Sequence, residues 1–423
     1  MEKKKQIDCF LPYSTAAITQ SLAAQLHESG VVKSIYTLAA DVPPTEALPQ
    51  YTHHLQAGSL LSLATMRLIA ATTTADYALL YLKQGPITLG YHALERMLQV
   101  AEETGAAMVY ADHYSVEAGK TVKHPVTDYQ LGSIRDDFDF GSVVLLKTDY
   151  LKEFEAKKEI ARDYQYAGWY ALRLFLSRKG ELFHLNEYLY TEEEDDLRAS
   201  GEKQFDYVNP RNREVQIEME QAATAHLSAI NALVDTTQYA QPDFSAETFP
   251  VEASVVIPVF NREKTVRDAV VSALSQKTDF PFNVIVVDNH STDGTMEILS
   301  TLAADERLVH LIPTRTDLGI GGCWNYAIND AHCGRFAVQL DSDDLYSSEN
   351  TLQVIVNAFH EQKAAMIVGS YRMCDFELNT LPPGLISHNE WTEDNGYNNA
   401  LRINGLGAPR AFFTPLVRQH QFP

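Results

Sequence analysis

The chain has 423 residues, of which 45% are hydrophobic and 10% aromatic, a composition typical of a folded protein of two or three domains. It carries 34 basic and 56 acidic residues, and the resulting net charge of −22 argues against a nucleic acid or an anionic membrane as its main partner. The charge does not exclude a small phosphorylated ligand, because a bound divalent cation inverts the local sign of an acidic pocket.

Cysteine usage and hydropathy predict the compartment. The four cysteines show no metal or redox spacing, so reduced thiols in a cytoplasm fit better than a disulfide framework. The first apolar stretch is interrupted by Asp8, Pro12 and Ser14, which is not the pattern of a signal peptide. No run approaches the roughly 18–20 apolar residues of a membrane span. We therefore expect a cytoplasmic protein, soluble or at most peripheral at the inner face of the membrane.

Short apolar runs alternate with longer helical patterns along the whole chain, which is typical of α/β units. In the N-terminal half, the runs at 77–82 and 106–110 are predicted strands with a helix between them. The acidic run Glu192–Asp196 is most simply a solvated loop.

A helix is predicted over residues 211–234, because Val215, Met219 and Leu227 lie in one apolar stripe. The polar, proline-containing stretch Asp235–Pro250 that follows is the expected linker. We therefore predict a first domain over 1–210, a helix and linker over 211–250, and a second domain over 251–423.

The second domain begins with the pattern of a parallel sheet. Residues 254–257 and 284–287 are predicted buried strands, and residues 264–276 between them have helical apolar spacing. A third strand, 336–340, leads directly into Asp341. Polar clusters follow these strands, and open parallel sheets bind ligands at that edge.

The two halves of the chain contain an internal repeat. The aligned stretches are 10–12 with 256–258, 77–86 with 336–345, and 106–110 with 364–368. We therefore expect a second copy of the same fold at the N-terminus, in which Leu82 and Gln84 stand in place of Asp341 and Asp343. Neither replacement supplies the anionic oxygen that a hard cation prefers, so this copy should bind no metal.

A candidate metal motif, Asp341-Ser342-Asp343, directly follows the third strand. Alternation in an extended segment places both carboxylates on the same side. Carboxylate oxygens on a rigid strand end suit Mg²⁺ or Mn²⁺ that bridges phosphates. Taken alone, the motif also fits an acidic surface turn.

Three clusters precede this motif, and their order and spacing carry more information than any one of them. They are Val-Val-Ile-Pro-Val-Phe-Asn at 255–261, Val-Asp-Asn-His-Ser-Thr-Asp-Gly-Thr at 287–295, and Asp-Leu-Gly-Ile-Gly-Gly-Cys-Trp-Asn at 317–325. Over about residues 251–375 this arrangement resembles glycosyltransferase family 2. The resemblance implies an α/β protein of two tandem GT-A domains, Rossmann-like nucleotide-diphospho-sugar transferase folds, the first of them degenerate.

The resemblance also implies roles for individual residues. Pro258 and Asn261 match the wall of the nucleobase pocket. Asp288 and Asn289 match the pair of which one accepts a hydrogen bond from the uracil N3–H. Asp343 matches the direct ligand of Mn²⁺ or Mg²⁺. The other expected nucleotide-sugar contacts are Asp293, Gly321, Asn325, Ser342 and Asp341, the last also on the metal side.

Structural roles compete with these assignments. Residues 291–293 equally fit a cap for the following helix, and the glycines at 319–322 equally fit a tight turn. Asn325 also fits a contact with the core or a helix end. Trp324 fits packing, and it stands where most relatives have an arginine, so a charge on the diphosphate from that side is in doubt.

Family 2 implies inversion, for which a carboxylate must take the proton of the acceptor. The N-terminal segment Tyr166–Tyr170 resembles the family's Tyr-Gly-Glu-Asp-Tyr motif without its acids. Its counterpart in the second domain would fall past Pro423, so we expect a domain truncated at its C-terminus, with the base beyond the truncation. Glu390, Glu393 and Asp394 are the alternative candidates.

The sequence therefore predicts metal-dependent, inverting transfer from a nucleotide sugar, expected to be a UDP-sugar, to a glycan or lipid-linked glycan in cell-surface polysaccharide synthesis. A non-catalytic nucleotide-sugar or glycan-binding protein is the alternative. A nucleotidyltransferase or dehydrogenase is disfavoured, because the turn at 258–263 lacks the glycine-rich phosphate fingerprint.

Overall fold

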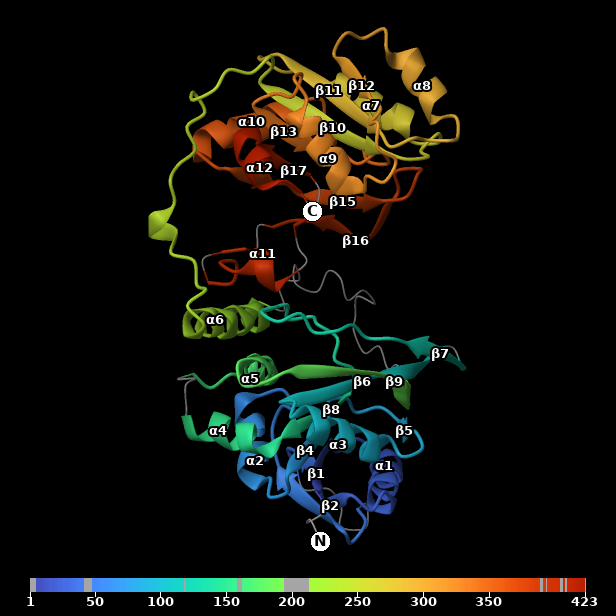
Figure 1. Ribbon diagram of the computed structural model, residues 1–423, viewed down its shortest axis with the longest axis vertical. Helices are drawn as coiled ribbons and strands as arrows, with labels where there is room; N and C mark the ends of the chain where they lie inside the picture. Colours follow the sequence, from blue (N-terminus) through green and yellow to red (C-terminus); the bar gives the residue numbers. More distant parts are fainter. Residues whose placement is uncertain are drawn as a thin grey trace. The chain divides into compact units, whose positions relative to one another are not determined.

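The computed structural model describes residues 5–41, 48–117, 119–157, 162–193, 213–388, 391–392, 394–403, 406–407 and 409–422. The chain forms two compact units (Figure 1). The N-terminal unit comprises residues 1–233 together with 390–405, and the C-terminal unit comprises residues 234–389 together with 406–423. Strands and helices alternate in both units, which confirms the predicted α/β class.

The N-terminal unit is built on a mixed sheet of nine strands, ordered β3-β2-β1-β4-β8-β6-β9-β5, with β7 paired to β6. The strands are β1 (Ile7–Pro12), β2 (Val32–Ala39), β3 (Thr52–Gln56), β4 (Tyr77–Tyr81), β5 (Ile87–Leu89), β6 (Met108–Glu117), β7 (Lys120–His124), β8 (Val143–Lys147) and β9 (Leu182–Glu193). The helices are α1 (Ala16–Glu28), α2 (Leu63–Thr72), α3 (Ala93–Thr104), α4 (Thr148–Lys157), α5 (Gly168–Ser177), α6 (Arg213–Ala229) and α11 (Asn399–Arg402).

Helices cover both faces of this sheet. Phe10 of β1 belongs to the core that contains residues of α2, α4, α5 and α6, whereas Cys9 and Leu11 belong to the core that contains residues of α1 and α3. Both faces of the strand are buried, and all of its residues except Asp8 are apolar.

The C-terminal unit has a six-stranded sheet, ordered β12-β11-β10-β13-β17-β14, and a separate hairpin of β15 and β16. The strands are β10 (Ala253–Val259), β11 (Phe282–Asp288), β12 (Leu308–Leu311), β13 (Phe336–Gln339), β14 (Met366–Val368), β15 (Tyr371–Cys374), β16 (Thr380–Ile386) and β17 (Arg410–Phe413). The helices are α7 (Val266–Leu274), α8 (Thr295–Leu302), α9 (Ile320–Asn329), α10 (Thr351–Gln362) and α12 (Thr414–His420), with a 3-10 turn at Thr236–Gln238.

This sheet is also covered on both faces. Val255 and Ile257 of β10 pack with α7, α8 and α10, and Val256 packs in the core that contains α9. The three strands and the helix predicted between residues 254 and 340 are confirmed, to within a few residues at their ends.

The two sheets share the order of six strands. The path β3-β2-β1-β4-β8-β6 corresponds to β12-β11-β10-β13-β17-β14, and the fifth strand of each path is antiparallel to both of its neighbours. The register also corresponds, since Ile7 pairs with Tyr77 as Ala253 pairs with Phe336. This correspondence between the two sheets matches the alignment of the sequence repeat. In it, Leu82 takes the position of Asp341.

The division of the chain differs from the predicted boundaries in two respects. Helix α6 lies in the N-terminal unit rather than outside it, because its residues Ala222, Ala223 and Leu227 pack in that unit's core. Residues 390–405 also belong to the N-terminal unit, although they lie between β16 and β17 of the C-terminal unit in sequence.

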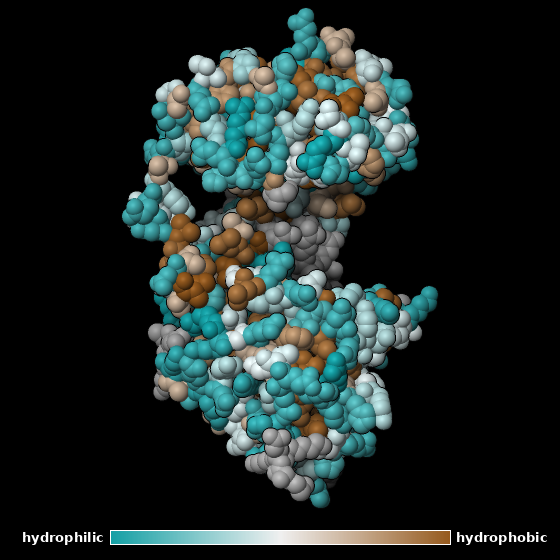
Figure 2. Space-filling model, in the orientation of Figure 1, coloured by the Kyte–Doolittle hydropathy of each residue, from teal (hydrophilic) through white to brown (hydrophobic). Residues whose placement is uncertain are grey.

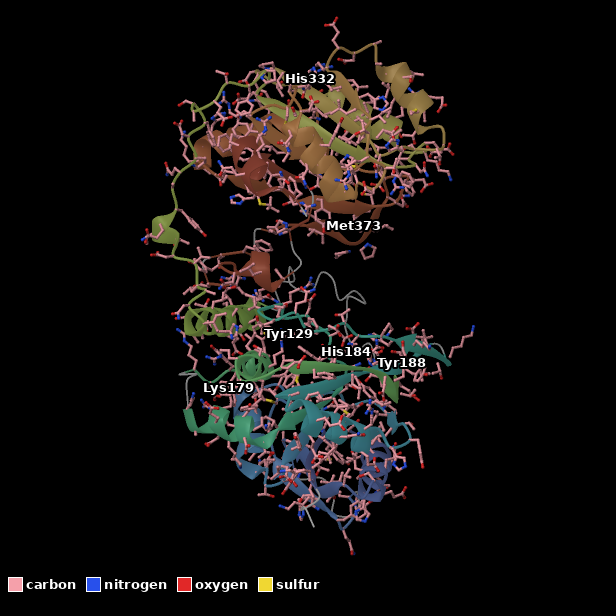
Figure 3. The ribbon with its side chains drawn as sticks, viewed as in Figure 1. Tyr129, Lys179, His184, Tyr188, His332 and Met373 are labelled. Carbon is pink, nitrogen blue, oxygen red and sulfur yellow. The ribbon has the colours of Figure 1, made fainter. Side chains whose placement is uncertain are left out.

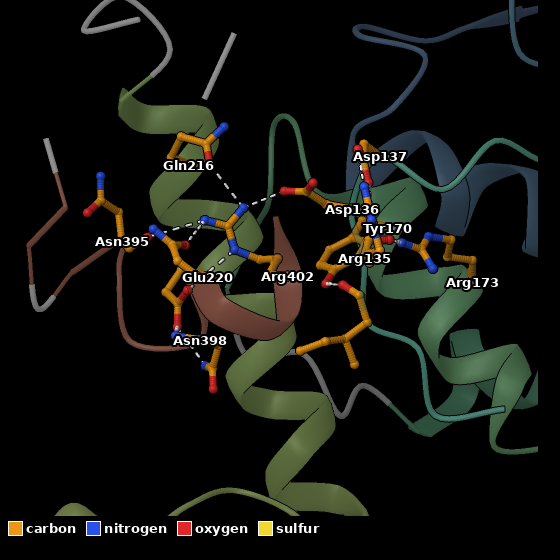
Figure 4. Close-up of polar contacts among 12 residues, drawn as sticks. Arg135, Asp136, Asp137, Tyr170, Arg173, Gln216, Glu220, Asn395, Asn398 and Arg402 are labelled. Carbon is orange, nitrogen blue, oxygen red and sulfur yellow. Dashed lines mark hydrogen bonds and ion pairs between the residues drawn. The ribbon is translucent and has the colours of Figure 1, made fainter. Parts of the chain in front are cut away.

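A buried arginine, Arg402, joins the segment 390–405 to the rest of the N-terminal unit (Figure 4). Arg402 of α11 is fully buried, and its guanidinium donates hydrogen bonds to Asp136, to Glu220 at 3.3 Å and to Gln216 at 3.0 Å. Asn398 donates to the same Glu220 carboxylate at 2.6 Å. Two acidic side chains and one cation thus share one hydrogen-bonded network away from water.

The stability of the N-terminal unit is expected to fall as the pH is lowered from about 6.5 to about 4. His226 of α6 is 6% exposed, and burial, followed by the nearby Arg178 and Arg173, lowers its pKa to about 4. The imidazole stays neutral in the folded chain while it becomes protonated in the unfolded one, which costs about 3 kcal/mol across this range. Urea unfolding of His226→Phe should show a shallower pH dependence. The exposed His27→Gln is the matched control, and an unchanged slope in His226→Phe would contradict this explanation.

Among the described residues, no helix is long and apolar enough to cross a membrane. Hydrophilic residues cover most of the visible face of each unit (Figure 2).

Candidate functional site

Three loops of the C-terminal unit emerge at one edge of its sheet. Strand β10 pairs in parallel with both β11 and β13, so the chain leaves all three strands in the same direction. The polar clusters after Val259, Asp288 and Gln339 therefore share the carboxyl edge, where open parallel sheets bind ligands. Pro258, the first predicted pocket residue, is half-buried near the end of β10.

Asn261 ties the first two loops together. Its backbone is left-handed, with a φ of 53°, a conformation that asparagine tolerates better than most residues. Its side-chain Oδ1 accepts from the Thr292 N–H at 2.7 Å, and its own N–H donates to Ser291 Oγ at 3.0 Å. These bonds give Asn261, Ser291 and Thr292 a role in shaping the loops.

At the end of β11, two side-chain oxygens that can accept a hydrogen bond have no donor among the described residues. Asp288 is fully buried, and its Oδ1 accepts from the Ser291 N–H at 2.8 Å. Asn289 donates through Nδ2 to the Leu318 carbonyl. Asp288 Oδ2 and Asn289 Oδ1 are buried, and neither finds a hydrogen-bond partner among the described residues. His310 Nε2 stands 3.7 Å from Asp288 Oδ2, too far for a hydrogen bond. Unfilled buried acceptors are costly, which points to a ligand donor.

Asp293 is used by the backbone around it. Its Oδ1 accepts from the Thr295 N–H at 3.0 Å at the start of α8, and its Oδ2 accepts from the Glu263 N–H at 3.1 Å. These contacts favour the helix-start role that competed with nucleotide binding in the sequence.

The glycine-rich segment is helical for most of its length. Gly319 is the N-cap of α9, and Gly321 and Gly322 lie in the first turn of the helix rather than in a tight turn before it. A Cβ on Gly322 would lie 2.9 Å from the end of the Leu318 side chain, so a larger residue there would require that side chain to shift.

Asn325 and Trp324 are engaged in packing at α9. Asn325 donates to the Phe422 carbonyl and accepts from the Phe422 N–H, both at 2.7 Å. Trp324 is buried and contacts the rings of Phe412 and Phe422. Both polar groups of Asn325 are thus used inside the unit, which favours the structural alternative.

Carboxylates gather directly after β13. Asp341 is partly buried, Ser342 is buried, and the Asp343 side chain is 46% exposed with its Oδ2 3.7 Å from Arg262 Nε. Loss of water around the Asp344 carboxyl, followed by the charges of Asp341 and Asp343, raises the pKa of Asp344 to about 6, although part of the residue is exposed. A raised pKa next to other carboxylates marks a concentration of negative charge that a cation would stabilise.

Sequence reasoning missed two residues at this cluster. Gln339, the last residue of β13, donates through Nε2 to Asp341 Oδ1 at 2.8 Å. Arg410, the first residue of β17, donates through Nε to Gln339 Oε1 at 2.8 Å. Gln339 adjoins the Asp-x-Asp motif and could have been singled out as a polar residue in an apolar strand. Nothing in the sequence pointed to Arg410.

At the corresponding edge of the N-terminal sheet, Lys83 and Glu192 form an ion pair. The prediction made for Glu192 was wrong. Glu192 was expected in a solvated loop, but it ends β9 with its side chain 1% exposed. Lys83 and Ser142 donate to its carboxylate, and His113 Nε2 lies 3.3 Å away. Burial alone would raise the pKa of Glu192, but the hydrogen bonds from these three residues hold it at about 2. Residues 194–196 of the same run lie outside the described residues.

Of the three alternative candidates for the base, the structure describes only Asp394. Glu390 and Glu393 lie outside the described residues. Asp394 belongs to the N-terminal unit, where its carboxylate lies 3.7 Å from Arg213 and is 73% exposed. The identity of the base stays a prediction.

Two hollows of the structure lie away from the three loops. One, of about 270 Å³, is in the N-terminal unit between α2, α4, α5 and α6. The other, of about 730 Å³, opens in the C-terminal unit at the amino ends of β11 and β12, beside His332 (Figure 3). Because parallel sheets bind ligands at the carboxyl edge, neither hollow displaces the three loops as the candidate site.

These clusters lie in a segment of the chain that resembles known proteins. Residues 254–418 match the sequence model of "Glycosyl transferase family 2". The chain is 29% identical over 128 residues to an uncharacterized glycosyltransferase of Haemophilus influenzae, a match that covers 30% of this chain and 50% of that protein. It is 26% identical over 154 residues to the Escherichia coli UDP-Glc:alpha-D-GlcNAc-diphosphoundecaprenol beta-1,3-glucosyltransferase WfgD, covering 36% and 56%.

Further relatives include the O-antigen chain rhamnosyltransferase WbaN of Salmonella anatum, 26% identical over 27% of this chain and 36% of that protein. The chain thus spans between 36% and 56% of the length of these three relatives. Among solved structures, Staphylococcus aureus TarS 1–349 in complex with UDP is 24% identical with a TM-score of 0.33, covering 41% of this chain and 50% of that one. The comparisons therefore show that residues 254–418, fewer than half of the chain, are similar to glycosyltransferase family 2.

Proposed function

We propose that the C-terminal unit transfers a sugar from a UDP-sugar to a glycan or lipid-linked glycan acceptor, with inversion at the anomeric carbon. The observation that carries this proposal is the pair of unfilled, buried acceptors at the end of β11, at the same sheet edge as the carboxylates that follow β13. The name of WfgD, a UDP-glucose-dependent enzyme with a lipid-linked acceptor, supports both substrate classes.

Asp288 and Asn289 are proposed to bind the nucleobase. Uracil offers one ring N–H donor at N3, and Asp288 Oδ2 and Asn289 Oδ1 can only accept. Burial of this contact gives it selectivity for uracil over cytosine, because cytosine N3 carries no hydrogen and cannot donate to either oxygen.

Asp341 and Asp343 are proposed to hold Mg²⁺ or Mn²⁺ together with the donor diphosphate. Within the part of the chain that the structure describes, no group of three or more His, Cys, Asp or Glu side chains could hold a metal ion. Two carboxylates nevertheless fit a cation that takes its remaining ligands from phosphate oxygens and water. Such a cation would neutralise the charge that develops on the leaving diphosphate.

Contacts among the loops at this edge of the sheet support the proposed binding of the nucleotide sugar. The bonds of Asn261 to Ser291 and Thr292 hold the β10 and β11 loops together, which fixes the nucleobase acceptors relative to the first loop. Arg262 Nε, 3.7 Å from Asp343 Oδ2, places a positive charge beside the position proposed for the diphosphate. We leave the general base unassigned.

The N-terminal unit is proposed to be a degenerate GT-A copy that binds neither metal nor nucleotide. The shared strand order and register support this reading. By that register Leu82 and Gln84 replace Asp341 and Asp343. At the end of β2, Ala39 and Ala40 stand where Asp288 and Asn289 stand at the end of β11. The ion pair between Lys83 and the buried Glu192 would occupy the edge with the unit's own charges.

A donor screen tests the proposal. Calorimetric titration of the chain with UDP in the presence of Mn²⁺ should give one site per chain, and thermal unfolding should shift upward with UDP-sugars more than with GDP- or CMP-sugars. Two sites per chain would show that the N-terminal unit keeps a working site. Equal shifts with UDP-sugars and CMP-sugars would contradict the role given to Asp288 and Asn289.

A further inference from the structure

A chain of two hydrogen bonds runs from Arg410 through Gln339 to Asp341. Both bonds measure 2.8 Å. A guanidinium only donates and a carboxylate only accepts, so the amide of Gln339 has a single orientation that satisfies both neighbours. We propose that Gln339 and Arg410 are positioning residues for Asp341 in the binding of the metal and the donor, an inference that rests on the proposed function.

Because Gln339 is buried, its amide would be unfavourable there without the hydrogen bonds to both Asp341 and Arg410. Gln339 is 4% exposed, and the three residues before it in β13 are apolar and fully buried. An amide in such surroundings loses free energy unless its donor and acceptor are both paired. Here both are paired, and the bond to Asp341 Oδ1 restricts the rotation of the carboxylate.

The N-terminal unit shows that this sheet does not need the polar pair. Leu80 pairs with Phe10 as Gln339 pairs with Val256, so Leu80 is the counterpart of Gln339. Leu80 in turn pairs with Val144, the counterpart of Arg410.

The counterpart strands β4 and β8 therefore pair two apolar residues, Leu80 and Val144, at the position where the C-terminal unit has an amide and a guanidinium. The polar pair is present where Asp341 is present, and it is absent where Leu82 replaces that aspartate. A function at Asp341 explains this difference, whereas a requirement of the fold does not.

Variants that copy the N-terminal unit test the inference with little risk to folding. In Gln339→Leu the affinity for Mn²⁺ with UDP, measured by electron paramagnetic resonance of free Mn²⁺ and by calorimetry, should fall about 10–100-fold, as is typical when the partner of a metal ligand is removed. Arg410→Val should also weaken binding. The double variant should bind no more weakly than Gln339→Leu, because Arg410 acts through Gln339. Arg410→Lys keeps a donor and should recover part of the affinity. The double variant, which removes both polar groups together, should keep the unfolding temperature of the unsubstituted chain.

The outcomes separate this inference from the proposed function. Undiminished affinity in Gln339→Leu, with binding intact in the unsubstituted chain, overturns the positioning role and leaves the proposed function standing. Additive losses in the double variant overturn the role of Arg410, since they mean that it contacts the nucleotide directly. An unsubstituted chain that binds neither Mn²⁺ nor UDP overturns the proposed function and this role together.

Discussion

Replacement of Asp343 by alanine is expected to abolish metal-dependent UDP binding. The Asp343 carboxylate is half-exposed at the end of the third loop, in the position proposed for a direct metal ligand. Changes to groups that only support a ligand already cost 10–100-fold in metal affinity, so loss of the ligand itself should cost more than about 100-fold. Calorimetric titration of Asp343→Ala with UDP, with and without Mn²⁺, measures this loss.

Gln84→Ala is the matched control for this substitution. Gln84 is the exposed counterpart of Asp343 in the N-terminal unit, so its removal should leave UDP affinity and stoichiometry unchanged. Asp343→Ala with the affinity and metal dependence of the unsubstituted chain would exclude Asp343 as a ligand. A loss in Gln84→Ala would instead locate binding in the N-terminal unit.

Replacement of Arg402 by methionine is expected to destabilise the N-terminal unit by about 3–5 kcal/mol. The guanidinium is fully buried and donates to both Asp136 and Glu220. Methionine fills part of the same volume but leaves two buried carboxylates without their cation, and an unpaired buried charge costs far more than an exposed one. Urea unfolding, followed as the transition of the N-terminal unit, measures the effect.

The loss should depend on pH in a defined direction. Burial raises the pKa of Asp136 above its ordinary value, and Arg402 opposes that rise. Without Arg402 the pKa of Asp136 should rise further, so the folded chain takes up a proton at a pH where the unfolded chain does not. The destabilisation should therefore be larger at about pH 7.5 than at about pH 5.

Arg96→Met is the control for the removal of an arginine from the same unit. Arg96 pairs with Glu187 through two nitrogens, but both side chains are about two-fifths exposed. Exposed pairs typically contribute less than about 1 kcal/mol. Equal losses in Arg96→Met and Arg402→Met would show that burial of the Arg402 network adds nothing to stability.

Local order in the sequence predicted most of the candidate site. Apolar runs placed β10, β11 and β13, and the polar residues at their ends could be identified because parallel strands bring such ends to one edge. The choice between ligand contact and local structure could not be made from residue type. Asp293 and Asn325 have the chemistry of nucleotide contacts, but their polar groups bond to neighbouring backbone groups.

For Glu192, the acidic composition of the surrounding run gave the wrong prediction of solvent exposure. An acidic run reads as solvated because an isolated buried carboxylate is costly. The cost is offset here by Lys83, Ser142 and His113, which lie far from Glu192 in sequence and reach it through the pairing of different strands. No local pattern around residue 192 reports those partners.

The sequence by itself determined the α/β class, the strand-end clusters of the C-terminal unit, and the register in which Leu82 and Gln84 replace two aspartates. Each of these depends on the order of neighbouring residues, which the chain states directly. Only the tertiary structure decided that residues 390–405 join the N-terminal unit through Arg402, and that Arg410 reaches Asp341 through Gln339. Those contacts join residues tens to hundreds of positions apart, and burial and strand pairing, rather than local periodicity, select which of many polar groups meet.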